Sequence, residues 1–182
     1  MRALALVALA ACAAEPSVSV RVRYQQGGVD PEIQHFTEAG AWSWQSADIG
    51  YRVFDPADQD VYGLAHDECA KPIWPRDAGA PPCVVTVAIK FVPGSELDQA
   101  LGVAYPNIRS VTMRAELRSF DLMAVAAHEV GHVVFHKWDH LATDEHGIMH
   151  ASDQGFIAPT DDDLAWVARA ESGDSGEGSV AP

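Results

Sequence analysis

Hydrophobic and polar residues alternate in the first third of the chain, in a pattern that predicts two strands and a helix. Every second residue is apolar over residues 18–24, which indicates a strand with one face buried. Pro31 opens a stretch whose apolar side chains recur at helical spacing as far as Trp44, and proline is favoured at the first position of a helix. Alternation returns over residues 49–53, where a second strand is expected.

Three more strands are predicted in the middle of the chain. Residues 84–92 are almost all apolar or β-branched, as expected of a strand that is covered on both faces. Residues 101–105 run into Pro106, which a sheet tolerates at its edge, so they are expected to form a short edge strand. Val111 and Met113 alternate with polar residues and predict one strand more.

Two further helices are predicted in the last third. The first is expected to begin with Asp121 as its cap and to bury one apolar side. The second starts in the acidic turn over residues 160–163, whose charges suit the positive end of a helix dipole better than they indicate a calcium site. The predicted order β, α, β, β, β, β, α, α indicates an α/β (α+β) fold with a mixed sheet. Three tryptophans are expected to pack in its core or grooves: Trp42, Trp44 and Trp166.

The length and composition fit one soluble globular domain. The chain has 182 residues, of which 48% are hydrophobic and 21% charged. Lys and Arg number 12 against 26 Asp and Glu, which gives a formal charge of −14. That balance argues against a nucleic-acid partner, whose phosphates attract basic proteins, and against a basic patch that reads an anionic membrane. No apolar run approaches the roughly 20 residues that span a bilayer.

The N-terminus has the pattern of an export signal. A single basic residue precedes an apolar stretch of about nine residues, which predicts a signal peptide over residues 1–11. The sequence from Leu9 to Cys12 resembles the bacterial lipobox, and this resemblance implies cleavage before Cys12 and lipidation of that cysteine. The protein would then be anchored in the cell envelope; the alternative is ordinary secretion after cleavage at the small residues 11–13.

The two other cysteines are expected to pair. With Cys12 lipidated or removed, Cys69 and Cys83 form an even pair in an oxidising compartment. Their disulfide would close a loop of about 15 residues and stabilise the domain by roughly 3 kcal/mol. We expect a short linker over residues 12–16, a folded domain over 17–170 that is monomeric, and a disordered tail over 171–182, which has little to bury.

The chemistry is concentrated in the segment His128-Glu129-Val130-Gly131-His132. Two histidines four residues apart lie on one face of a helix, so both imidazoles can reach one ion. Glu129 is placed to activate a metal-bound water without binding the metal itself. Zn²⁺ suits these ligands and acidifies water, which would then attack a peptide carbonyl with Glu129 as general base.

Several segments together resemble the metzincin zinc proteases, the matrixin group in particular. Residues 121–132 resemble the active-site helix of that family, 147–149 its Met-turn, and 158–166 the start of its C-terminal helix. Residues 101–105 stand where the family has the edge strand that pairs with an extended substrate. The resemblance implies a metzincin-like zincin fold, zinc bound by the two helical histidines and a third after a glycine turn, and Met149 as the floor beneath the metal.

The third ligand departs from the family pattern HExxHxxGxxH, because Phe135 occupies the glycine position and Trp138 the ligand position. Three ligands in one axial row of a helix cannot surround a tetrahedral ion, so the third must come from chain that has turned back. We predict His140, which a slightly longer turn can bring to the metal. The alternatives are Asp139, His136 and His146.

The sequence therefore predicts an exported zinc endopeptidase that acts on a peptide or protein substrate. The alternative is a catalytically inactive, metzincin-like lipoprotein that binds metal or peptide. Retention of Glu129 favours catalysis, because a binding protein needs no general base. Three further histidines are expected to be surface residues: His35, His66 and His150.

Overall fold

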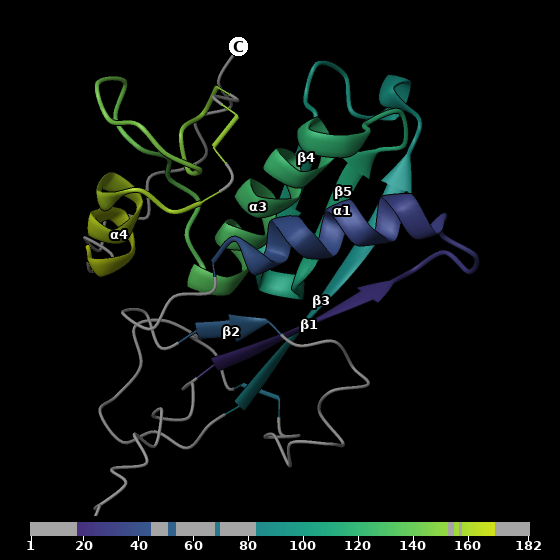
Figure 1. Cartoon of the computed structure of the whole chain (residues 1–182), viewed down its shortest axis with the longest axis horizontal. Helices are drawn as coiled ribbons and strands as arrows, with labels where there is room; N and C mark the ends of the chain where they lie inside the picture. Colours follow the sequence, from purple (N-terminus) through teal and green to yellow (C-terminus); the bar gives the residue numbers. More distant parts are fainter. Residues whose placement is uncertain are drawn as a thin grey trace, which may run out of the picture.

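The computed structural model describes residues 18–44, 51–53, 68–69, 83–152, 155–156 and 158–169. The signal peptide over residues 1–11, Cys12, the linker 12–16, His66 and the tail 171–182 lie outside the described residues and stay predictions. The helices and strands follow the predicted order (Figure 1). They are β1 (Val18–Tyr24), α1 (Pro31–Trp42), β2 (Tyr51–Val53), β3 (Cys83–Val92), the 3-10 helix η1 (Gly94–Glu96), β4 (Gly102–Tyr105), the 3-10 helix η2 (Pro106–Ile108), β5 (Ser110–Arg114), α3 (Ser119–Phe135) and α4 (Asp161–Ala168).

The strands form one mixed sheet in the order β2-β1-β3-β5-β4, which confirms the mixed α/β class. The first four strands in that order run parallel to one another, whereas β4 is antiparallel to β5, with Val103 opposite Thr112. Because β4 is the last strand of the order, one of its sides pairs with no other strand in the part of the chain that the structure describes. The prediction of a short edge strand before Pro106 is confirmed.

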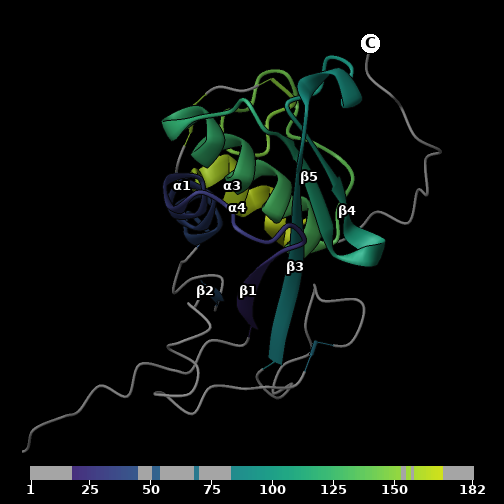
Figure 2. The same ribbon diagram turned by 90° about the vertical axis from the view of Figure 1, so that its right-hand side faces the viewer.

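Helices α1 and α3 lie together on one side of β3 and β5 (Figure 2). The opposite face of β3 is less covered in its middle, where Thr86 and Ala88 are half-buried and Lys90 is exposed, whereas Val84 and Val92 on the same face are buried. The expectation that this strand is covered on both faces therefore holds at its two ends and is wrong for residues 86–90. The long apolar run arises because the helices bury every second residue, and Val84 and Val92 are buried on the other face as well.

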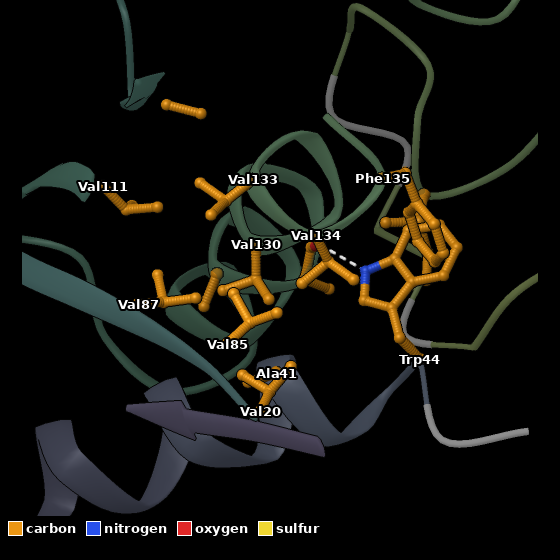
Figure 3. Packing of buried hydrophobic residues seen from close by; sticks show 14 of the residues in the cluster. Val20, Ala41, Trp44, Val85, Val87, Val111, Val130, Val133, Val134 and Phe135 are labelled. Atoms are coloured by element: carbon orange, nitrogen blue, oxygen red, sulfur yellow. Dashed lines mark hydrogen bonds between the residues drawn. The ribbon is translucent and has the colours of Figure 1, made fainter. Parts of the chain in front are cut away.

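Valine side chains from the sheet and from α3 fill the space between the two layers (Figure 3). Trp44 closes one end of this core, where its ring lies 4.9 Å from that of Phe135 and its Nε1 donates to the Ala127 carbonyl at 2.6 Å. Trp44 and Trp166 are both 0% exposed, as expected, but Trp42 is 49% exposed and does not belong to the core. Trp42 is the last residue of α1, between the buried Ala41 and the buried Trp44.

Helices α3 and α4 begin in different ways. Helix α4 starts with a capping box, in which Thr160 accepts from the Asp163 amide and Asp163 accepts from the Thr160 amide, and this confirms the predicted N-terminal turn. Helix α3 begins at Ser119 after Arg118, so the prediction of Asp121 as its cap is wrong. Asp121 lies inside the first turn, where a carboxylate still favours the positive end of the helix.

Cys69 and Cys83 form a disulfide with their Cα atoms 4.9 Å apart. The bridge joins the start of β3 to Cys69. The preceding residue, Glu68, has its carboxylate 2.7 Å from the guanidinium of Arg109. None of the helices in the described part of the chain has the length and apolar character needed to cross a bilayer.

Candidate metal centre

Helix α3 presents His128 and His132 on one face, with their Nε2 atoms 3.1 Å apart. The other ring nitrogen of each histidine faces a backbone carbonyl: Nδ1 of His128 lies 2.6 Å from the Ile148 oxygen, and Nδ1 of His132 lies 2.8 Å from the Lys137 oxygen. A carbonyl only accepts, so Nδ1 carries the proton in both rings and Nε2 keeps its lone pair. Such outer hydrogen bonds fix the rings of metal-binding histidines.

The chain turns back directly after α3 and brings in a third histidine. Helix α3 ends at Phe135, and His136 adopts the left-handed conformation with φ 54° and ψ 43°. The reversal therefore falls one residue after the position where the family pattern has glycine. His140 then returns to the helix face, where its Nε2 lies 3.3 Å from that of His132.

The Nε2 atoms of His128, His132 and His140 can hold one metal ion. The ligand atoms of the three residues all lie within 4.8 Å of one another, and they are the one such group among the described residues. Zn–N bonds of about 2.0–2.1 Å in a tetrahedron place neighbouring nitrogens roughly 3.3–3.4 Å apart, close to the separations found here. The other candidates, His136, Asp139 and His146, lie outside the group.

Burial keeps two of the three rings in the form that binds metal. The pKa of His132 is lowered well below its usual value, first by burial and then by charge on His128 and His140. Burial also lowers the pKa of His140, although this ring is exposed on its outer side. Both imidazoles are thus neutral near pH 7, and a neutral imidazole is the ligand that a metal takes.

Glu129 lies under the edge strand, beside the three histidines. Its side chain is 7% exposed and touches β4 at Gly102, where an added Cβ would stand 2.8 Å from the Glu129 Cγ and 2.9 Å from its Oε1. Burial raises the pKa of Glu129 to about 8, and a hydrogen bond with the Ala104 backbone opposes that shift. The carboxyl can therefore exchange a proton close to neutral pH.

Met149 lies beneath the site, fully buried against α3. Gly131 allows this close packing, because an added Cβ would stand 2.7 Å from the Met149 sulfur and 2.8 Å from the Trp44 ring. The carboxylate of Asp163 holds the turn from the other side by accepting from the Ile148 and Met149 amides, each at 2.9 Å. Helix α4 thereby fixes the carbonyl of Ile148, which faces the ring of His128.

A cleft of about 280 Å³ opens onto these groups. Its walls come from the start of β4, from the face of α3 and from the loop around Met149. The lining residues are Gln99–Gly102, Ala124, Val125, His128, Glu129, His140, Gly147, Ile148, His150, Ala151 and Phe156. One side of the metal centre thus faces a space that a ligand can enter.

Sequence reasoning missed three residues of this region. His150 was expected to be a surface residue, but it is half-buried and lines the cleft. Gly102 was taken only as part of a strand, although glycine within a strand is itself a sign of close approach. Asp163 was read as one of three acidic residues in a helix turn; its position three after Thr160 was the available signal of a capping role.

Comparison with known proteins adds no relative. No protein-family model matches the chain, and no curated protein is significantly similar to it.

Proposed function

We propose that this protein is an exported zinc-dependent endopeptidase with a metzincin-like, matrixin-type zincin fold. The observation that carries the proposal is the convergence of three histidine Nε2 atoms beside the buried carboxyl of Glu129, in an open cleft. A purely structural zinc site is closed by four protein ligands, whereas three ligands and an open side are typical of catalytic zinc.

The residues present fit zinc. The cluster offers three imidazole Nε2 atoms, of which that of His132 lies 3.1 Å from that of His128 and 3.3 Å from that of His140. The rings of His128 and His132 are oriented by the carbonyls of Ile148 and Lys137. When bound there, Zn²⁺ would acidify water and polarise a carbonyl oxygen.

Glu129 is proposed as the general base. In the absence of metal the pKa of this carboxyl is about 8. A nearby cation lowers that pKa, so the carboxyl can be ionised when substrate arrives. Glu129 then takes a proton from the attacking water and delivers it to the amine that leaves. Its position against Gly102 holds the carboxyl at the side of the cleft that β4 forms.

The edge strand is proposed to bind the substrate backbone. Strand β4 pairs with β5 on one side, and its Leu101–Gly102 end lines the cleft. An extended peptide that adds to the free side of β4 would form backbone hydrogen bonds and pass close to Glu129. This mode suits an endopeptidase, because it binds the middle of a chain and requires no free terminus.

The proposal is tested with the purified exported form, by metal analysis combined with digestion of a broad peptide library. We expect about one zinc per chain and cleavage at internal peptide bonds. Glu129→Gln should keep the zinc and lose hydrolysis, because the amide has nearly the same volume but cannot take a proton. Tight zinc binding without cleavage of any peptide by the unaltered protein would instead favour the metal- or peptide-binding lipoprotein.

A further inference from the structure

One ionisable side chain in the cleft has no role in the mechanism above. His150 lines the cleft together with Glu129 and His140, directly after the buried Met149. Met149 in turn packs against Gly131 of α3, between the two helical histidines of the metal centre. His150 therefore lies in the wall of the cleft, one residue after the methionine beneath the metal centre.

The hydrogen bonds of His150 indicate which ring nitrogen carries a proton. Nδ1 lies 3.2 Å from the backbone nitrogen of Ser152, which can only donate, and 2.8 Å from the Ser152 hydroxyl oxygen. In the neutral ring Nδ1 is then the acceptor, so Nε2 carries the hydrogen. The Ser152 carbonyl, 3.2 Å from Nδ1, can accept from Nδ1 of the charged ring, in which Nε2 is also protonated. In both of these states Nε2–H is a donor.

The position of this donor is fixed by the backbone beneath it. The amide of His150 donates to the Gly147 carbonyl at 3.3 Å, and the preceding amide of Met149 donates to the buried Asp163. A donor held in place before the reaction costs no reorganisation when charge develops nearby. No hydrogen-bond partner of His150 other than Ser152 and Gly147 lies among the described residues.

We propose that His150 is a further catalytic residue of the peptidase, whose Nε2–H donates a hydrogen bond to the scissile carbonyl oxygen as that oxygen becomes negative. This inference rests on the proposed function. The proton stays on His150 throughout, while the proton of the attacking water goes to Glu129. The role differs from that of the three metal-binding histidines, because it requires a protonated Nε2 and theirs requires a bare one.

Three variants test the role on a peptide that the library digest shows to be cleaved. His150→Ala should lower kcat by about 10²–10³-fold with little change in KM, since the hydrogen bond forms mainly in the transition state. His150→Gln keeps an N–H donor and should recover at least about tenfold of that loss. His146→Ala removes an exposed histidine of the same loop, outside the cleft lining, and should leave kcat unchanged.

Two readouts separate catalysis from a structural role. Bound zinc should be the same in all three variants and in the unaltered protein. A phosphinic analogue of the cleaved peptide, whose tetrahedral oxygens mimic the transition state, should bind His150→Ala about 10²-fold more weakly by calorimetry, while the cleaved product binds equally. An unchanged kcat in His150→Ala, or equal weakening of analogue and product, overturns the inference while the peptidase assignment stands. A protein that cleaves no peptide overturns both.

Discussion

At the residue scale, the carboxyl of Glu129 has a pKa far above its usual value. It is 7% exposed between α3 and β4, and this burial raises its pKa from 4.5 to about 8. The folded, metal-free protein therefore holds a proton on Glu129 over a pH range in which the unfolded chain has released it. Stability must then fall as pH rises through that range.

The comparison with Glu129→Gln isolates this effect, because the histidines are the same in both proteins. Below about pH 4.5 the two metal-free proteins should have similar free energies of unfolding, since both side chains are neutral. Between about pH 4.5 and 8 the unaltered protein should lose stability relative to the variant, by an amount on the order of 5 kcal/mol, and the difference should level off above that. Urea unfolding of both proteins after chelation, from pH 4 to 9, measures it; a constant difference would contradict the burial of this carboxyl.

His136 shows why the ligand set could be predicted only in part. The HExxH spacing was enough to select His128 and His132, because helical geometry places such a pair on one face. The third ligand depended on where the chain leaves the helix. A non-glycine residue in the left-handed region costs about 1–2 kcal/mol, and nothing in the local sequence says which residue accepts that cost. Asp139, His136 and His146 therefore stayed open beside His140.

At the element scale, the close approach of α3 to β4 places the base in the cleft. Gly102 makes that approach possible: an added Cβ would also stand 2.9 Å from the Val125 side chain, besides its contacts with Glu129. Distances under 3.0 Å require the two elements to separate or the carboxyl to move. The position of Glu129 thus depends on a residue in a different element, about 27 positions earlier in the chain.

Gly102→Ala should reduce peptidase activity without removing the metal. The added methyl group pushes on the Glu129 side chain, whereas the three histidines lie outside its contacts. We expect kcat/KM to fall by at least about tenfold, in keeping with the sensitivity of catalysis to small misplacements. Gly27→Ala is the matched control, because no atom lies within 4 Å of a Cβ at that position. Equal activity in both variants would show that β4 does not constrain the base.

The bounds of most elements could be predicted, because periodicity reports which residues face a core. The strand over residues 18–24 and the helix from Pro31 are where the alternation and the proline placed them. The contact that ties α4 to the site could not be seen, because the carboxylate of Asp163 looks in sequence like those of its two acidic neighbours. Only the folded chain shows that the Asp163 carboxylate accepts hydrogen bonds from the Ile148 and Met149 amides.

At the scale of the whole molecule, the site forms where segments far apart in the chain meet. The edge of the sheet supplies Gly102, α3 supplies the first two histidines and the base, and the turn after α3 supplies His140. The loop around Met149 lies beneath the metal centre, and α4 holds that loop in place (Figure 1). A mixed sheet with helices on one side brings these parts to the end of a single cleft, so metal binding, base and substrate strand depend on one arrangement.

The most direct test of the account is zinc content in single alanine variants of the four candidate third ligands. The unaltered protein and the variants are exchanged in parallel into buffer with a weak chelator, and metal is measured by mass spectrometry. We expect about one zinc per chain in the unaltered protein and in the variants His136→Ala, Asp139→Ala and His146→Ala, because these residues lie outside the cluster. His140→Ala should lose most of its zinc, since only two of the three imidazoles remain. Full zinc in His140→Ala together with loss in any other variant would contradict the metal centre described above.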